Sequence, residues 1–301
     1  MLTPEELRQA LAAPGIKPMI LDTDTYNEID DQFALAFAMR SPERVRLLAV
    51  TAAPFLNARS SSPADGMEKS YQEIFRIARL TDPAFSFPVY RGAENYMTDP
   101  HTPVESPACD AIIDAVMASD ETVYIVAIGA ITNVASALVK CPAIAKKAVL
   151  VWLGGHADFM PDAREFNLFQ DLIASKIVFD SKIPFVQVPC VGMATTLTTT
   201  VEELSALIGG KNELCDYLVG IVSHEAGTRR PYSRVIWDVL AVSALVCPQN
   251  LAITVKSRPS LDENFRYVPV NDGRHFLYVY HLNRDAIFAE LFEKLGKKAE
   301  V

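Results

Sequence analysis

The sequence predicts an α/β protein whose open, mostly parallel sheet is covered by helices on both faces, as in a Rossmann-like fold. Short apolar runs rich in Val, Ile and Leu recur along the first two thirds of the chain, and segments with helical periodicity separate them. Strands that are buried on both faces have this continuous apolar character, because helices cover the sheet on either side. The alternation of the two segment types is typical of a parallel sheet.

The elements follow in chain order. Thr3 and Glu6 have capping-box spacing, which indicates a helix at the N-terminus. Apolar runs predict strands at 17–21, 45–51, 122–128, 148–155 and 184–190. Helical patterns occupy 30–39, 67–80, 133–140, 201–209, 213–226 and 234–245. Late strands are expected at 251–255, 265–270 and 275–282, before a last helix at 284–296. No linker rich in Pro, Gly or Ser divides the chain, so we expect residues 1–301 to form a single domain.

Composition excludes several classes of function. Half of the 301 residues are hydrophobic and 22% are charged, which is a globular balance. The net charge of −9 and the lack of a Lys/Arg block argue against nucleic acid as a partner. No apolar stretch is long enough to span a membrane, and the N-terminus does not resemble a secretory signal. The five cysteines are odd in number and lack metal-type spacing, so we expect reduced thiols and a cytoplasmic location.

The most informative stretch is "LDTDTYNEIDDQF" at 21–33, which places Asp22, Asp24, Glu28, Asp30 and Asp31 within ten positions. It directly follows the first expected strand, and ligands of open parallel sheets bind beyond the carboxyl ends of strands. Crowded carboxylates suit a hard cation such as Ca²⁺, which takes about six to eight oxygen ligands. A second interpretation stays open, in which the acidic residues only stabilise the N-terminus of the next helix.

A short part of this stretch allows a different chemistry. "LDTDT" is similar to the nucleophile motif of haloacid-dehalogenase-type phosphatases, which would make Asp22 the nucleophile and Asp24 the acid. That similarity covers five residues and leaves the later motifs of the chain unexplained. It predicts Mg²⁺ dependence and phosphate release.

A longer series of motifs resembles the nucleoside hydrolase family. After the acidic loop come "IGAITNVA" at 128–135, "LVWLGG" at 150–155, "REFNLFQD" at 164–171 and "WDVLAV" at 237–242, in the family's order. The resemblance covers residues 17–295 and is far more specific than any one motif. It implies an enzyme that hydrolyses the N-glycosidic bond of ribonucleosides, binds Ca²⁺, and assembles as a homodimer or homotetramer.

The resemblance also implies roles for individual residues. Ca²⁺ would be held by Asp24, Asp31, the carbonyl of Ile128, and Asp238. The ribose would be held by Asp30, Glu165 and Asn167. Asp24 would in addition act as the general base toward a Ca²⁺-held water, and Asp22 would lie behind the ligands as a hydrogen-bond acceptor. Carboxylates suit this chemistry, because loss of the base develops positive charge at C1′ of the ribose.

Several positions depart from the family's usual pattern. Five residues rather than three separate the D-x-D pair from the D-D pair, and Phe55 and Phe159 stand where members commonly have a sugar-binding Asn. Trp237 precedes Asp238, as in the purine-preferring branch, so we expect its indole to stack on a purine base. The two Phe positions also leave open a noncatalytic relative that binds a nucleoside or sugar without turnover.

Overall fold

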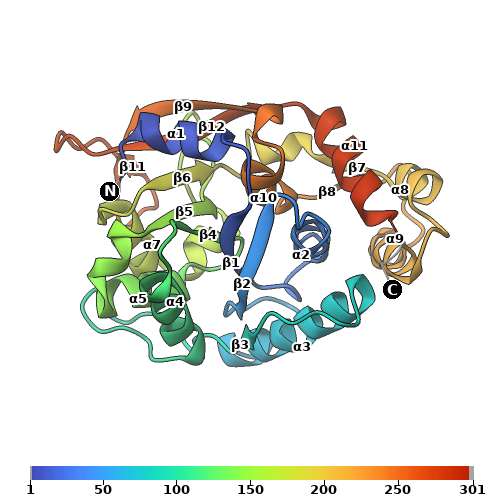
Figure 1. Cartoon of the computed structure of the whole chain (residues 1–301), viewed down its shortest axis with the longest axis horizontal. Coiled ribbons are helices and arrows are strands. Elements are labelled where there is room, and N and C mark those ends of the chain that lie inside the picture. Colours follow the sequence, from blue (N-terminus) through green and yellow to red (C-terminus); the bar gives the residue numbers. More distant parts are fainter. Residues whose placement is uncertain (1, 298–301) are drawn as a thin grey trace.

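The computed structural model describes residues 2–297, and an eight-stranded sheet forms its centre (Figure 1). In spatial order the strands are β3 (Val89–Tyr90), β2 (Val45–Ala52), β1 (Lys17–Thr23), β4 (Val123–Ala127), β5 (Ala148–Leu153), β6 (Phe185–Val188), β12 (His275–Leu282) and β9 (Leu251–Ser257). Each neighbouring pair is parallel except β12 with β9, which is antiparallel. The predicted α/β class and mostly parallel sheet are confirmed.

Two hydrophobic clusters pack helices against the two faces of this sheet (Figure 1). One face carries α4 (Pro107–Ala118), α5 (Thr132–Lys140) and α7 (Leu172–Asp180). The other face carries α1 (Pro4–Ala12), α2 (Asp31–Met39), α3 (Pro63–Thr81), α10 (Val239–Val246) and α11 (Arg284–Leu295). Outside this second layer lie α8 (Val201–Leu207) and α9 (Glu213–Ala226), while the short α6 (Phe166–Gln170) follows β5. Burial of both faces explains why the strands are continuous apolar runs.

Side chains cap several helices at their first turn. Thr3 and Glu6 make both bonds of the predicted capping box at the start of α1. Ser62, Ser106 and Asn212 each accept a bond from the backbone N–H three residues further on, at 3.1, 3.1 and 2.8 Å. The first turn of a helix leaves such N–H groups without partners, so these residues fix where α3, α4 and α9 begin.

Two predicted elements are shorter than expected. The helix predicted over 234–245 begins only at Val239, because Arg234–Val235 is a short strand, β8, that pairs with β7 (Thr198–Thr199). Trp237 therefore precedes the helix rather than lying within it. The strand predicted over 265–270 is reduced to β11 (Tyr267–Val268), paired with β10 (Ser260–Leu261). Pro269 follows at once, and it has no N–H with which to continue the ladder.

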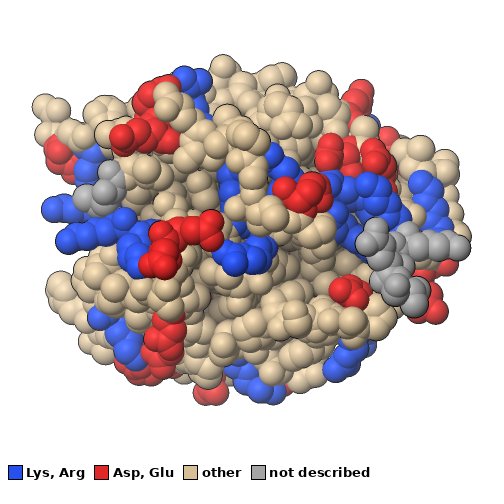
Figure 2. Space-filling model, viewed as in Figure 1, with Lys and Arg blue, Asp and Glu red and all other residues tan. Residues whose placement is uncertain are grey.

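The surface carries charges of both signs. On the face in Figure 2, acidic and basic side chains are interspersed rather than segregated. Within residues 2–297, none of the helices is both long enough and apolar enough to cross a membrane.

Candidate active site

A pocket of about 240 Å³ lies beyond the carboxyl ends of β1, β4 and β5. Most of the residues predicted from the sequence line it: Asp30, Asp31, Ile128, Glu165, Asn167, Trp237 and Asp238. They come from segments more than 200 positions apart, which the parallel sheet brings to one edge. The remaining predicted residue, Asp24, is fully buried and is not part of the pocket lining.

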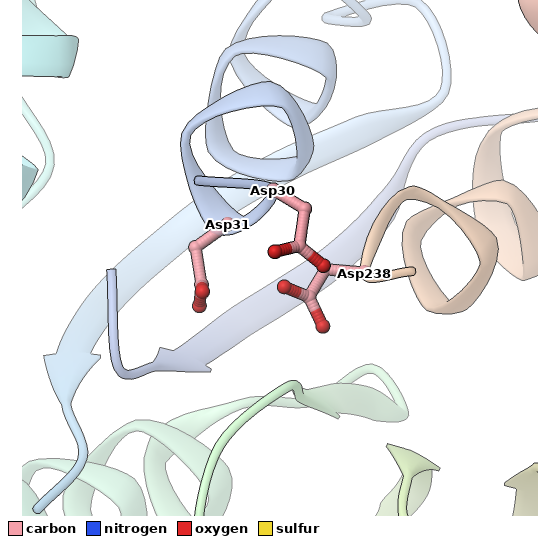
Figure 3. A group of neighbouring side chains, drawn as sticks. All are labelled: Asp30, Asp31 and Asp238. Carbon is pink, nitrogen blue, oxygen red and sulfur yellow. The ribbon is translucent and has the colours of Figure 1, made fainter. Parts of the chain in front are cut away.

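Three buried carboxylates meet at one wall of this pocket (Figure 3). Asp30 and Asp31 begin α2, and Asp238 directly precedes α10. One oxygen of each lies within 4.8 Å of the others, so together they can hold a metal ion. Asp30, which was predicted to contact the ribose, thus also belongs to the carboxylate group. Oxygen ligands of this kind suit a hard divalent cation.

The local environment resists ionisation of this group. Burial raises the pKa of Asp31 to about 7, and the charge of Asp30 adds to the shift, although Thr23 donates a hydrogen bond of 2.5 Å to Asp31. Burial, followed by the charges of Asp30, Asp31 and Asp24, raises the pKa of Asp238 well above its ordinary value. Like charges in a low-dielectric site favour proton uptake or the binding of a cation.

Asp24 has the least satisfied side chain of the site. It has no exposed surface, and neither carboxylate oxygen has a hydrogen-bond partner among residues 2–297. Burial, with the charges of Asp31 and Asp30, raises its pKa well above the ordinary value. A Cβ at position 129 would lie 3.0 Å from Cγ of Asp24, so Gly129 permits the close approach of the β4 loop. Buried acceptors without donors indicate that a partner, such as a cation, is to be bound here.

Asp22 lies behind this group. Its Oδ1 accepts hydrogen bonds from Thr51 at 2.6 Å and from Asn133 at 2.8 Å, and burial raises its pKa to about 6. These contacts agree with the predicted role of an acceptor behind the ligands. Asp22 has no exposed surface, and its Oδ1 is already engaged by two donors of the protein, whereas Asp24 has none among the residues described.

The acidic loop is in contact with a basic residue, and the sequence analysis did not predict this contact. Arg234, whose side chain is 14% exposed, pairs with Asp30 at 3.2 Å, with Glu225 at 3.0 Å, and with Glu28. Arg59 supports the same loop by donating to the backbone carbonyl of Glu28 at 2.8 Å. The two extra residues of the loop were a signal that its contacts differ from the family pattern. Sequence spacing could not identify Arg234, on β8, as the partner of this loop.

Glu165 is held rigidly at the start of α6. Its carboxylate accepts N–H bonds from Gly155 at 2.9 Å, Asn167 at 2.8 Å and Leu168 at 3.2 Å. Burial raises its pKa to about 7 in spite of these bonds. Three fixed donors leave the carboxylate little freedom to turn. It can therefore present its remaining lone pairs to the pocket in one orientation.

Asn167 connects two strands at the floor of the pocket. Its Nδ2 donates to the carbonyl of Ile128 at 3.1 Å and to that of Leu153 at 2.9 Å. The carbonyl of Ile128 therefore already accepts one hydrogen bond, and a second lone pair remains for another ligand. The two bonds fix the plane of the Asn167 amide.

The two Phe departures place no aromatic side chain in the pocket. Phe55 is fully buried and Phe159 is 71% exposed, and neither lines the pocket. His156 does line it, and its Nδ1 is buried without a partner among the residues described. Burial lowers the pKa of this imidazole. Its place directly after the "LGG" motif is the sequence signal that could have identified it as a pocket residue.

The pocket also includes side chains without a role predicted from sequence. The lining includes Asn27, Glu28, Arg164, Phe166 and Cys190. Burial raises the pKa of the Cys190 thiol well above its ordinary value, so this sulfur is a poor nucleophile at neutral pH.

Comparison with known proteins identifies the family of the chain. The family model described as inosine-uridine preferring nucleoside hydrolase matches residues 19–276. The non-specific ribonucleoside hydrolase RihC of Klebsiella pneumoniae (strain 342) is 29% identical over 248 residues, which are 77% of this chain and 80% of that protein. The pyrimidine-specific ribonucleoside hydrolase RihA of Enterobacter sp. (strain 638) is 33% identical over 195 residues, or 56% of this chain and 58% of that protein.

A solved structure supports the fold independently. The purine-preferring ribonucleoside hydrolase from Gardnerella vaginalis has a TM-score of 0.75 to this chain, with 22% identity, and the match covers 93% of this chain and 98% of that one. The family match extends over most of the sheet and includes every residue that lines the pocket. The chain belongs to the nucleoside hydrolase family and is an N-glycosyl hydrolase, that is, a ribonucleoside hydrolase.

Proposed function

We propose that this enzyme hydrolyses ribonucleosides to free base and ribose with a bound Ca²⁺, and that it prefers purine nucleosides. The observation that carries the metal assignment is the Asp24 carboxylate, which is fully buried with neither oxygen hydrogen-bonded within residues 2–297. It lies beside three further carboxylates whose oxygens are within 4.8 Å of one another. All of these donors are hard oxygens, so the residues present fit Ca²⁺.

The proposed ligands are Asp24, Asp31, Asp238 and the carbonyl of Ile128. When bound, Ca²⁺ would supply charge neutralisation and would make a water molecule easier to deprotonate. Asp24 is proposed to accept the proton of the attacking water, because its carboxylate lies beside the carboxylate group and neither of its oxygens is engaged by a donor within residues 2–297.

The other pocket residues are proposed to hold the sugar and to stabilise the charge that develops on it. The Glu165 carboxylate and the Oδ1 of Asn167, fixed by bonds to the backbone, accept hydrogen bonds from the ribose hydroxyls. Asp30 faces the same pocket and contributes negative potential where C1′ becomes positive. The pocket of about 240 Å³ is of a size suited to the sugar.

The purine preference rests on Trp237. Its side chain lines the pocket, is partly buried against the core, and precedes α10. An indole can stack on the larger surface of a bicyclic base, and such contacts are favourable beyond the buried area. Related proteins carry both non-specific and pyrimidine-specific names, so preference varies within the family.

We further propose that residues 1–301 form one nucleoside hydrolase domain, that the enzyme acts in the cytoplasm on a small-molecule nucleoside, and that it assembles as a homodimer or homotetramer. Size-exclusion chromatography with light scattering measures the last of these directly.

The central test is a screen for base and free sugar release. Inosine, adenosine, guanosine, uridine and cytidine are each incubated with enzyme that was treated with chelator and with enzyme to which calcium was restored. We expect release only with calcium, and faster release from the purine nucleosides. Equal rates with and without metal would contradict the cation assignment, and faster uridine cleavage would contradict the role of Trp237. Binding without release would favour the noncatalytic alternative.

A further inference from the structure

The extended part of the acidic loop places an amide side chain at the catalytic pocket. Of the residues at 25–29, which are two more than the family pattern has here, Asn27 and Glu28 line the pocket. The carboxylate of Glu28 is already paired with Arg234. Asn27 is 8% exposed, and its hydrogen bonds decide which of its polar atoms is left for a substrate.

Contacts with Asn57, in the loop after β2, fix the orientation of both amides. The Oδ1 of Asn57 accepts the backbone N–H of Arg59 at 2.8 Å, and its Nδ2 donates to the backbone carbonyl of Asn27 at 3.2 Å. A backbone N–H can only donate and a backbone carbonyl can only accept, so the Asn57 amide has a single possible orientation. The same Nδ2 donates to the Oδ1 of Asn27 at 2.6 Å. The Asn27 amide is therefore fixed as well, with its oxygen toward Asn57.

This orientation leaves the Nδ2 of Asn27 as a free donor at the pocket. Within residues 2–297 it donates to no protein group, and it is not among the completely buried atoms that lack a partner. Asp30, Glu165 and the Oδ1 of Asn167 present acceptors to the same pocket. A hydroxyl group that donates its proton to one of these acceptors still has lone pairs to accept an amide N–H.

We propose that Asn27 donates a hydrogen bond to a hydroxyl oxygen of the ribose, and that Asn57 is the positioning residue that holds its amide in this orientation. The inference rests on the proposed function, because the ribose is part of the substrate of that reaction. It also connects two departures from the family pattern. Phe55 replaces the expected amide after β2, and Asn57, two positions further on, does not line the pocket. The amide that contacts the sugar comes instead from the longer acidic loop.

The test is the steady-state kinetics of inosine hydrolysis at saturating calcium, or of uridine hydrolysis if the enzyme cleaves uridine faster. Asn27→Leu keeps the size of the side chain and removes the donor. We expect KM to rise about tenfold, the value of one hydrogen bond. The kcat should change little, because a hydroxyl that does not react is bound equally in the ground state and the transition state.

A second variant and a control accompany this measurement. Asn27→Asp keeps an acceptor for Asn57 and loses only the donor, so it should also raise KM, and it reads the contact should Asn27→Leu fail to fold. The matched control is Asn264→Leu, the same change at an exposed position between β10 and β11, which should leave KM unchanged.

Two further measurements separate a contact with the sugar from a general effect on the loop. Asn57→Leu frees the Asn27 amide to turn and should raise KM, whereas the double variant Asn27→Leu/Asn57→Leu should have a KM no higher than that of Asn27→Leu alone, because the two residues act through one contact. The 2′-, 3′- and 5′-deoxy forms of the nucleoside identify the hydroxyl. The KM penalty of Asn27→Leu should disappear with the form that lacks the bonded hydroxyl and persist with the other two.

The outcomes for this contact and for the proposed function are distinguishable. A wild-type protein that releases no base from any nucleoside contradicts the proposed function. Calorimetric titration with inosine, which is then not consumed, still reads the contact as a Kd about tenfold weaker in Asn27→Leu. The proposal is overturned if the folded Asn27 variants have the KM or Kd of the wild type, if the penalty is the same with all three deoxynucleosides, or if the wild type neither cleaves nor binds a nucleoside.

Discussion

Replacement of Arg234 by Met tests how the acidic loop is stabilised. The substitution keeps most of the aliphatic volume and removes the guanidinium that contacts Asp30, Glu28 and Glu225. The Asp30 side chain is only 3% exposed, whereas those of Glu28 and Glu225 are 45% and 24% exposed. Water can therefore replace the guanidinium of Arg234 at the two glutamates more readily than at Asp30.

The expected loss follows from these exposures. Removing one partner of a buried ion pair costs about 3–5 kcal/mol, and an exposed pair contributes about 0–1 kcal/mol. We therefore expect Arg234→Met to lower the free energy of unfolding of the metal-free enzyme by about 3 kcal/mol at pH 8. For a chain of this size that corresponds to a Tm lower by roughly 5 °C. Calcium should reduce the loss, because it neutralises the same carboxylates.

The measurement is thermal unfolding at pH 8 with chelator and with saturating calcium. Arg229→Met is the matched control, because Arg229 is an exposed residue close in sequence that packs on Tyr232 and does not contact the acidic loop. It should shift Tm by no more than about 1 °C, as a surface substitution does. The reasoning is refuted if Arg234→Met is as stable as the control without metal, or if its loss is equally large with calcium.

Two further predictions concern the carboxylates themselves. Asp24→Asn should lower kcat by about 10²–10⁴-fold, because the general base is lost, and a turnover assay measures this effect. The same substitution should raise the Tm of the metal-free protein, because it removes a buried, unpaired charge. A thermal scan with chelator measures the second effect, and a lower Tm would contradict it. Burial raises the pKa of Asp22 to about 6 and those of Asp31 and Glu165 to about 7. The folded state therefore binds more protons than the unfolded state over this range. The free energy of unfolding of the metal-free protein should fall as the pH rises from about 4 to 7. Urea unfolding at pH 5 and pH 8 checks the sign, and greater stability at pH 8 would exclude it.

Much of this fold could be predicted because its signals are local. Strands buried on both faces are continuous apolar runs, so β1, β2, β4, β5 and β6 were identifiable in the sequence. The parallel sheet then placed the motifs that follow these strands at one edge. That is why the predicted pocket residues, all but Asp24, line one pocket.

What could not be predicted depends on contacts between distant segments. Arg234 lies 204 positions from Asp30, and nothing in the periodicity of its segment indicates a short strand that turns the guanidinium toward the acidic loop. The apolar pattern from Arg234 onward instead predicted one helix. The side-chain positions of Phe55 and Phe159 could not be predicted either, because a position in a motif does not fix on which side of a loop the side chain lies. One is buried in the core and the other is in solvent.

The magnitude of the repulsion within the carboxylate group decides between the two explanations of the acidic loop. Three ionised carboxylates with oxygens within 4.8 Å of each other repel by about 3.5 kcal/mol per pair at an effective dielectric constant of 20, or about 10 kcal/mol together. This is comparable to the whole stability of a typical domain. Arg234 contacts only Asp30 of the three carboxylates. The N-terminus of α2 stabilises each negative charge near it by about 1 kcal/mol. Helix capping alone therefore cannot keep the group ionised at neutral pH, and either protons or a divalent cation must be bound there.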